Sequence, residues 1–420
     1  MQPPGPAAGA LAERMLAALL AAADKRSVTA LVGANEPPLG VVVLPDLAAG
    51  VVIVDRGDET PEALKGRLEA ILRGHANGVL HLVLAGGGPA DRAILAEADR
   101  GAPDPNRLGV HLLDETGRLT RVAGRRLGLL AEAARLLGKV SPLTEAQLVV
   151  HNTRTKSARQ EAATFAATLD HRPQWAIRIL GAVCILMFAL AKLWGHRSFA
   201  MANFHMGANS TPFVRAGEVW RLLAYAFLHA NETHLIVNLI GLFSFGGFLE
   251  GLLGWRRIVI LYGLSALLGG IAAVFIGQVD LSVGASGALW GLMTAGIGIV
   301  LRREAILPPL ISGRLRPRLL SVLALNVAFS LAPLFVAGFP RIDLWAHAGG
   351  GVAGFALAAS GWLTRGLTPG APPSAAALNP RWLRVAAIAV LAVMAAAVAL
   401  ALINGQPWQP QVVPEPDQLT

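Results

Sequence analysis

From residue 174 onward, the sequence is dominated by seven long apolar segments. They cover about 175–195, 234–251, 256–277, 286–301, 319–338, 344–363 and 382–403. A helix needs roughly 17 to 25 apolar residues to cross the hydrocarbon core of a bilayer, so each segment is a candidate membrane span. The segment 286–301 is slightly short for that purpose. This pattern predicts a multi-span α-helical membrane protein whose main partner is the lipid bilayer.

The composition agrees with this expectation and limits the possible partners. Hydrophobic residues make up 54% of the chain and charged residues 15%, whereas soluble domains are near a quarter charged. The net charge of +9 comes mostly from arginine, which is weak support for nucleic-acid binding, and we expect no nucleic-acid partner. The one cysteine, Cys184, excludes an intramolecular disulfide and a cysteine-based zinc site. No cofactor or metal is predicted.

Residues 1–142 have a different character and predict a soluble α/β domain. Short Val/Ile/Leu runs alternate there with helical stretches, a pattern typical of a largely parallel sheet; the runs lie at 41–44, 51–54, 79–84 and 110–113. The first 24 residues lack the features of a signal peptide and favour a short amphipathic helix. Gly86-Gly87-Gly88 follows a strand without the spacing of a phosphate-binding loop, so we interpret it as a plain turn.

The remaining boundaries follow from changes in polarity along the chain. We expect a helical linker at 143–173, a membrane core at 174–366, a linker and last span at 367–403, and a tail at 404–420. The role of the N-terminal domain and the oligomeric state are left open by the sequence.

The basic residues between the spans indicate an orientation. With the N-terminal domain in the cytoplasm, the inner loops hold ten basic residues and the outer segments five. Cytoplasmic loops carry the excess of Lys and Arg, so we expect the N-terminus inside and the C-terminus outside, in a bacterial inner membrane. The inner residues are Arg256, Arg257, Arg302, Arg303, Arg314, Arg316, Arg318, Arg365, Arg381 and Arg384.

A few polar residues inside the spans fall at a common depth. With a rise of ~1.5 Å per residue, Ser286 lies about 24 Å above Arg302 at the inner end of its span. The same arithmetic places His347 about 27 Å above Arg365, and Asn238 about 27 Å above Arg256, with His234 one turn higher. Polar side chains are costly at membrane depth. Three helices that bring such residues to one layer therefore indicate a site near the outer surface.

The residue types in this layer suit hydrolysis of an amide. A serine hydroxyl needs a base to become a nucleophile, and His347 can take the proton of Ser286. The oxyanion that forms needs hydrogen-bond donors. His234, Asn238 and backbone N–H groups near Ser286 can supply them, because His234 and Asn238 share a helix face and Gly284 allows close backbone approach.

Each of these residues alone also has a structural interpretation, and the pattern bears on other functions. Ser286 between glycines is typical of close helix packing, and the His234–Asn238 pair could clamp two helices. A transporter is disfavoured because the interior of the spans has no Asp or Lys. Aspartyl and zinc-dependent proteases are excluded, since neither Gly-x-Gly-Asp nor His-Glu-x-x-His occurs.

Taken together, residues 174–366 resemble the rhomboid family of intramembrane serine proteases. The resemblance rests on six motifs in order: Trp220-Arg221, His229, His234-x-x-x-Asn238, Glu250-x-x-x-Gly254, Gly284-Ala285-Ser286-Gly287 and His347-x-x-Gly350-x-x-x-Gly354. It implies a six-helix core, to which this chain adds one C-terminal helix. It also implies single-span transmembrane substrates, cleaved near their outer ends. The alternative is a rhomboid-like protein that binds transmembrane segments without cutting them.

The resemblance further implies roles for single residues. Ser286 would attack, His347 would act as base and then acid, and His234, Asn238 and the Ser286 N–H would form the oxyanion hole. Gly350 and Gly354 would allow close helix packing, and Trp290 would lie under His347. By our interpretation Trp220, Arg221 and His229 brace the first loop, and Glu250 anchors the inner end of its span. We also hypothesise that residues 338–343 form a mobile cap.

Overall fold

The structure is a computed structural model, and it describes most of the chain between residues 8 and 405. The described residues are 8–26, 28, 30–32, 39–56, 60–74, 79–100, 102, 104–194, 198–302, 306–336 and 342–405. The chain divides into two compact units, Met1–Ala163 and Thr164–Thr420, which we call the N-terminal and C-terminal units. The boundary lies within helix α5, Glu145–Asp170.

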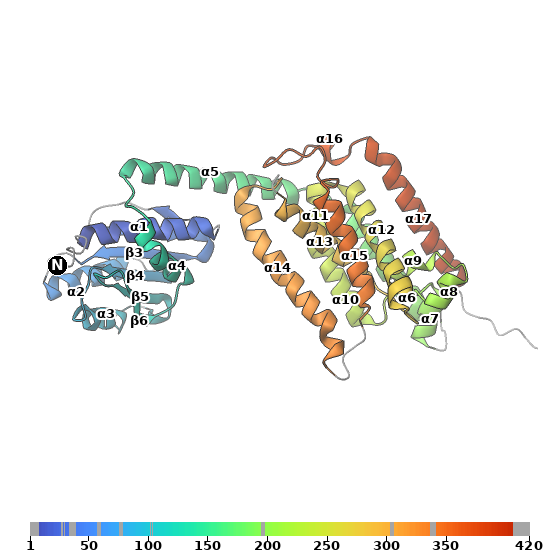
Figure 1. Cartoon of the computed structure of the whole chain (residues 1–420), viewed down its shortest axis with the longest axis horizontal. Helices are drawn as coiled ribbons and strands as arrows, with labels where there is room; N and C mark the ends of the chain where they lie inside the picture. Colours follow the sequence, from blue (N-terminus) through green and yellow to red (C-terminus); the bar gives the residue numbers. More distant parts are fainter. Residues whose placement is uncertain are drawn as a thin grey trace, which may run out of the picture. The chain divides into compact units, whose positions relative to one another are not determined.

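The N-terminal unit is a six-stranded sheet with helices on both faces (Figure 1). Its strands are β1 (Leu31–Val32), β2 (Leu39–Leu44), β3 (Ala49–Asp55), β4 (Val79–Ala85), β5 (Leu108–Leu113) and β6 (Leu119–Gly124). Its helices are α1 (Ala8–Lys25), α2 (Pro61–Gly74), α3 (Asp91–Arg100), α4 (Gly128–Leu136) and the first part of α5, with short 3-10 turns η1 (Pro45–Leu47), η2 (Pro105–Arg107) and η3 (Leu137–Lys139). The sheet order follows the sequence, from β1 to β6.

The prediction of a largely parallel sheet was wrong, because the sheet is mixed. Only β3–β4 and β4–β5 are parallel, and the other three pairings are antiparallel. The parallel pairs are the ones connected by helices α2 and α3, whereas the short η1 turn joins β2 to β3. A short turn can only return a strand in the opposite direction. The apolar runs looked alike because helices cover both faces of the sheet.

Alternate residues of β3 show how both faces are buried. Val51 and Ile53 pack with α1 and α4, and Val52 and Val54 pack with α2 and α3. The amphipathic helix expected at the N-terminus is α1, and its apolar side chains, such as Met15 and Leu19, are fully buried in this core. Helix α1 is therefore an integral layer of the N-terminal unit.

The C-terminal unit is a bundle of helices. It contains α6 (Trp175–Leu193), α7 (Phe199–His205), α8 (Thr211–Arg215), α9 (Arg221–Ala224), η4 (Tyr225–Phe227), α10 (Glu232–Gly241), η5 (Leu242–Gly246), α11 (Gly247–Leu253), α12 (Trp255–Ala272), η6 (Ala273–Gly277), α13 (Ser286–Leu301), α14 (Pro309–Leu331), η7 (Ala332–Leu334), α15 (Leu344–Ala359), α16 (Ala375–Leu378) and α17 (Trp382–Asn404). The elements η5 and η6 are π-helical turns that continue α10 and α12.

Five helical stretches among the described residues are long and apolar enough to cross a membrane. They are Trp175–Leu193, Glu232–Leu253, Trp255–Gly277, Pro309–Leu334 and Trp382–Asn404. Two shorter apolar helices, α13 and α15, have 16 residues each. The fifth span was expected to start at 319, but α14 starts ten residues earlier, at Pro309. Pro309 occupies its first turn, and the helix continues through Pro317. Proline is readily accepted at a helix start.

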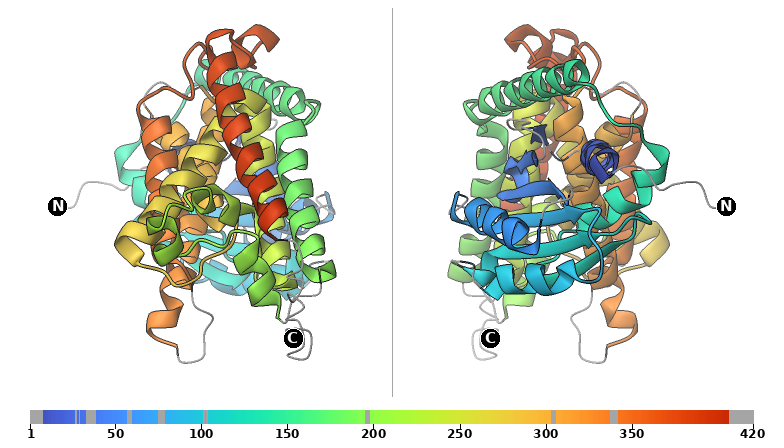
Figure 2. Two further views of the ribbon diagram at one scale, coloured as in Figure 1. Left: turned by 90° about the vertical axis from the view of Figure 1, so that its right-hand side faces the viewer. Right: turned by 90° about the vertical axis from the view of Figure 1, so that its left-hand side faces the viewer.

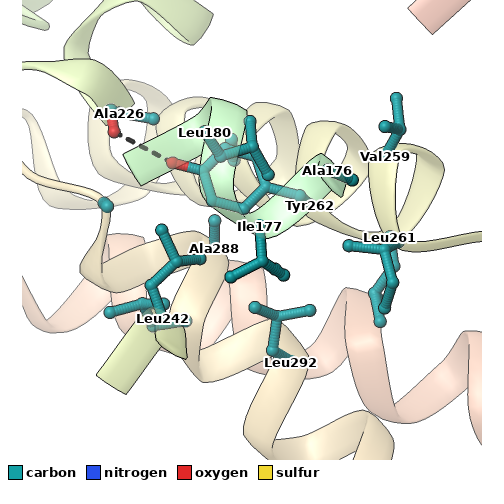
Figure 3. Close-up of a cluster of buried hydrophobic side chains, with 14 of the residues drawn as sticks. Ala176, Ile177, Leu180, Ala226, Leu242, Val259, Leu261, Tyr262, Ala288 and Leu292 are labelled. Atoms are coloured by element: carbon teal, nitrogen blue, oxygen red, sulfur yellow. Dashed lines mark hydrogen bonds between the residues drawn. The ribbon is translucent and has the colours of Figure 1, made fainter. Parts of the chain in front are cut away.

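The core of this bundle forms around α12. Figure 3 shows side chains of α6, α12 and α13 packed together, with the Tyr262 hydroxyl donating to the carbonyl oxygen of Ala226 at 3.1 Å. Cys184 of α6 is buried in the same core. Burial of such apolar surface excludes water, and each buried polar group there needs a partner.

The last helix, α17, lies along the outside of the bundle against α12 (Figure 2, left). The guanidinium of Arg257, at the start of α12, holds the segment that leads to α17. It donates to the carbonyl oxygens of Arg365, Ala377 and Leu378 at 2.8, 3.0 and 3.3 Å. Arg257 is fully buried, so these carbonyl groups compensate for the loss of its hydration.

Candidate active site

Ser286 and His347 are brought into direct contact by two short helices. Ser286 is the first residue of α13, and His347 lies in the first turn of α15. Ser286 Oγ and His347 Nε2 are 2.8 Å apart, which is a hydrogen-bond distance. A serine at the head of a helix also lies beside backbone N–H groups that have no partner within the helix.

Glycines set the spacing between α13 and α15. A Cβ atom at Gly350 would lie 2.0 Å from the carbonyl oxygen of Gly287, and one at Gly354 would lie 1.9 Å from that of Gly291. Neither position could hold a side chain without separating the helices. The two backbones therefore touch one turn below the Ser286–His347 contact, as small residues allow in membrane helices.

Trp290 lies under the imidazole ring, one turn after Ser286. The rings of Trp290 and His347 stack with centroids 5.3 Å apart and an interplanar angle of 19°. Thr294, one turn further, donates from Oγ1 to the carbonyl oxygen of Gly351 on α15 at 2.7 Å. Both side chains limit the movement of α15 along α13.

His234 and Asn238 of α10 lie beside the loop that leads into α13. A Cβ atom at Gly284 would lie 2.7 Å from the His234 ring and 3.6 Å from Asn238 Nδ2. Gly284 also has φ +131, a conformation that side chains disfavour. Its N–H donates to the Tyr225 carbonyl oxygen at 3.0 Å, which fixes the loop.

The amide nitrogen of Asn238 is a donor without an acceptor among the described residues. Asn238 is 5% exposed, and its Nδ2 is buried. A buried donor without an acceptor costs free energy, so it is suited to an oxygen atom supplied from outside. His234 is half-buried on the same face of α10.

His229, Trp220 and Arg221 belong to the loop region and do not join the Ser286–His347 contact. Burial lowers the pKa of His229 to about 3, so the ring is neutral, and it packs edge-on against His234. Arg221 is 4% exposed and donates to the carbonyl oxygens of Phe204 and Ala208 and to Glu218. Its guanidinium also lies over the Trp220 ring.

Glu250 lies on α11 and contacts the start of α6. Its two carboxylate oxygens accept the N–H groups of Ala176 and Ile177 at 3.0 and 2.9 Å. An acid at a helix N-terminus satisfies free N–H groups and the helix dipole. This contact anchors α6 and has no part in the Ser286–His347 arrangement.

One polar contact of His347 was missed by sequence reasoning. Ser330 Oγ, near the end of α14, is 3.0 Å from His347 Nδ1, and Ser330 is 4% exposed. The signal that could have found it is a serine within the apolar segment 319–338.

Two other expectations concern loops. The hypothesised cap at 338–343 lies largely outside the described residues, which omit 337–341. At Gly86–Gly88, the Asp91 carboxylate accepts the Gly88 N–H at 2.8 Å and pairs with Arg56 at 2.9 Å. The Asp91 carboxylate thus caps the turn at Gly88 and links it to Arg56.

Among the described residues, no group of three or more His, Cys, Asp or Glu side chains is placed to hold a metal ion. The side chains around Ser286 supply a hydroxyl, an imidazole and a hydrogen-bond donor. Such a set can transfer an acyl group through a serine.

Comparisons with known proteins match the same region. The family model of the Rhomboid domain matches residues 216–363. The putative rhomboid protease YdcA of Bacillus subtilis is 33% identical over 145 residues, which are 34% of this chain and 68% of the relative. The rhomboid protease GluP of Bacillus subtilis is 29% identical over 235 residues, 56% of this chain and 42% of the relative.

A plant protein named as rhomboid-like is also similar to this chain. The mitochondrial RHOMBOID-like protein 6 of Arabidopsis thaliana is 36% identical over 144 residues, 34% of this chain and 44% of the relative. The chain spans less than half the length of the Arabidopsis relatives it matches. The matched domain, the named relatives and the apolar helices together show that this chain belongs to the rhomboid family and is an integral membrane protein.

Proposed function

We propose that this chain is an intramembrane serine endopeptidase that cleaves transmembrane proteins near their outer ends. The observation that carries the proposal is the distance of 2.8 Å between Ser286 Oγ and His347 Nε2. Relatives named as rhomboid proteases support the reaction class. In this proposal Ser286 is the nucleophile and His347 is the general base and acid.

The first half of the reaction forms an acyl-enzyme. The Ser286 hydroxyl gives its proton to His347 Nε2, and an oxygen electron pair forms the bond to the substrate carbonyl carbon. The carbonyl π electrons move to the oxygen, which becomes an oxyanion. When the C–N bond breaks, the nitrogen leaves with the proton held by His347.

Water completes the second half. His347 takes a proton from water, the hydroxide oxygen attacks the acyl carbon, and the bond to Ser286 breaks. Ser286 recovers the proton from His347, and the carboxyl product departs. The bilayer core lacks water, so placing the site close to the outer surface favours this step.

The oxyanion would be held by donors that surround Gly284. Asn238 Nδ2 has no acceptor among the described residues, and the His234 ring lies beside it. The N–H of Ser286 at the head of α13 is a third donor by position. Donors fixed in place before the reaction stabilise the developing charge more than mobile ones do.

We further propose a topology for the whole chain. The excess of arginine in alternate loops favours a cytoplasmic N-terminal unit and an external C-terminus. We propose a bacterial inner membrane from the sequence alone. The relatives do not identify the membrane, because they come from plants, Toxoplasma gondii and Bacillus subtilis. Substrates are proposed to be single-span proteins that enter from the surrounding lipid.

The test is reconstitution of the full chain in liposomes with a single-span model substrate. We expect cleavage by the unsubstituted chain and a loss of roughly 10³-fold or more with Ser286→Ala or His347→Ala. A fluorophosphonate probe should label the unsubstituted chain and leave Ser286→Ala unlabelled. Undiminished cleavage by Ser286→Ala would refute the mechanism.

The same experiment separates the proposal from a non-proteolytic family member. A binder would retain the model substrate in a pull-down without cutting it. Its serine would remain unlabelled by the probe. In such a protein the pairing of nucleophile and base would be expected to be broken, whereas here Ser286 and His347 are within hydrogen-bond distance.

A further inference from the structure

His347 is contacted at both ring nitrogens by serine side chains from two different helices. Nε2 lies 2.8 Å from Ser286 Oγ on α13, and Nδ1 lies 3.0 Å from Ser330 Oγ on α14. The ring face stacks on Trp290. The imidazole is therefore fixed on two edges and one face by side chains that are themselves packed.

We propose that Ser330 is a positioning residue for His347, in the place that a carboxylate occupies in a Ser–His–Asp triad. The proposal deepens the proposed function and rests on it, since it concerns the same base. Ser330 Oγ accepts the hydrogen bond of His347 Nδ1–H. It does not touch the substrate, and it acts only through the imidazole.

The first consequence concerns the tautomer. A neutral imidazole carries one N–H, and the other nitrogen is an acceptor. If Nδ1 holds the proton and gives it to Ser330, Nε2 is left with a free lone pair toward Ser286. That tautomer is the one that can take the serine proton. A side chain that accepts at Nδ1 thus raises the fraction of productive base.

The second consequence concerns charge. After Ser286 transfers its proton, the ring is an imidazolium with two N–H groups, and each needs an acceptor. A hydroxyl oxygen is a weaker acceptor than a carboxylate, but it adds no charge to the membrane interior. A buried carboxylate would be costly there. Ser330 stabilises the charged ring at a smaller desolvation cost.

The placement of Ser330 is specific rather than typical of a serine in a membrane helix. One turn earlier, Asn326 donates to the carbonyl oxygen of Val322 in its own helix at 2.9 Å. Ser330 reaches across to another helix and is 4% exposed. Polar side chains in membrane interiors hydrogen-bond between helices when the partner is in reach.

The test compares fluorophosphonate labelling rates and cleavage kinetics of Ser330→Ala, Ser330→Thr and the unsubstituted chain in liposomes. We expect Ser330→Ala to lower kcat and the labelling rate about 10- to 100-fold with little change in KM. Ser330→Thr keeps the hydroxyl and should restore most of the rate. Ser321→Ala on the exposed part of the same helix is the matched control and should leave both rates unchanged.

A pH profile distinguishes positioning from loosened packing. Without its acceptor the imidazolium is less stable, so the acid limb of kcat in Ser330→Ala should move to lower pH. The other ionisable side chains nearby, His234 on α10 and Asp343 at the head of α15, are unchanged in every variant. Leu319→Ala, which loosens α14 against α13 far from the ring, should leave the acid limb in place.

The outcomes separate this proposal from the one on which it rests. If the unsubstituted chain cuts, Ser286→Ala does not, and Ser330→Ala keeps the full rate and profile, then the positioning role is overturned while the protease remains. If the unsubstituted chain shows no Ser286-dependent cleavage or labelling, the protease proposal itself fails. A slow Ser330→Ala that Ser330→Thr does not rescue, with an unmoved acid limb, also rejects the positioning role.

Discussion

Two buried histidines in the N-terminal unit form a polar pair within an apolar sheet. His81 on β4 and His111 on β5 are 2% and 4% exposed, and His81 Nδ1 lies 3.3 Å from His111 Nε2. Burial lowers the pKa of each to about 4, and Arg125 and Arg121 act in the same direction on His81 and His111 respectively. The folded unit therefore holds both rings neutral.

This pair predicts a loss of stability in acid. Unfolded histidines titrate near 6.5, so the unfolded state binds protons first as the pH falls. The stability that the neutral pair contributes is complete above 6.5 and is lost as the pH falls toward 4. Hydrogen exchange of peptides from β4 and β5, corrected for intrinsic rates, should show this loss of protection in the full chain.

A substitution isolates the effect of the pair. In His111→Gln one titrating ring is removed while a hydrogen-bond partner for His81 remains, so the decline between pH 6.5 and 4 should become shallower. His171→Gln, at an exposed position, serves as the control. An unchanged decline in His111→Gln would show that other groups cause the acid sensitivity.

The polar residues of the candidate site differ in how far the sequence predicts them. Ser286 and His347 could be placed in one layer because the rise of a helix is fixed and each span had a basic residue at its inner end. Ser330 was not predicted, although it lies in the apolar segment 319–338; the sequence places the start of this span at 319, whereas α14 begins at Pro309. The contact depends on how α14 leans toward α15, which one sequence does not specify.

At the scale of elements, the contact between α13 and α15 determines the site. The backbones meet at Gly350 and Gly354 without intervening side chains. The resemblance to the rhomboid family predicted this close packing at Gly350 and Gly354. The sequence did not predict the mixed sheet, since buried strands look alike whether their neighbours run parallel or antiparallel. The lengths of the connections indicate strand direction, because a short turn joins antiparallel strands and a helix connects parallel ones.

The glycine contact predicts a large effect from one methyl group. A Cβ at Gly354 would lie 1.9 Å from the Gly291 carbonyl oxygen, so Gly354→Ala should force α13 and α15 apart. We expect a destabilisation of about 1–3 kcal/mol and loss of fluorophosphonate labelling, measured together with thermal unfolding in detergent.

Gly351 provides the matched control for that substitution. A Cβ there would meet Thr294 and Trp290 at 3.5 Å, an ordinary contact distance. Gly351→Ala should therefore retain labelling and stability close to those of the unsubstituted chain. If both alanine variants behave alike, the spacing of the two helices is not set by Gly354.

At the scale of the whole molecule, the candidate site belongs to one of the two units. The contacts of Ser286, His347, Ser330, His234 and Asn238 described above all lie within the C-terminal unit. The N-terminal unit is a layered α/β fold in which the Asp91 carboxylate accepts the Gly88 N–H. The site contacts around Ser286 described above include no residue of the N-terminal unit.

The proposed topology can be measured with single cysteines in right-side-out membrane vesicles. A membrane-impermeant maleimide should label Glu415→Cys in the tail and should label Glu115→Cys, in the exposed β5–β6 turn, only after permeabilisation. The unsubstituted chain is the control, because its one cysteine, Cys184, is buried. The reverse pattern would overturn the orientation derived from the arginines.

The hydrogen bonds from Arg257 to carbonyl oxygens beyond residue 364 limit how this protein can be shortened. A version ending at 366, where the resemblance to the six-helix core ends, would retain the charge of Arg257 and discard the Ala377 and Leu378 carbonyl groups that solvate it. The segment Ala375–Leu378, which precedes the last helix, is thus held to the core by hydrogen bonds from a buried cation. A shortened version that keeps these hydrogen bonds has to extend at least through residue 378.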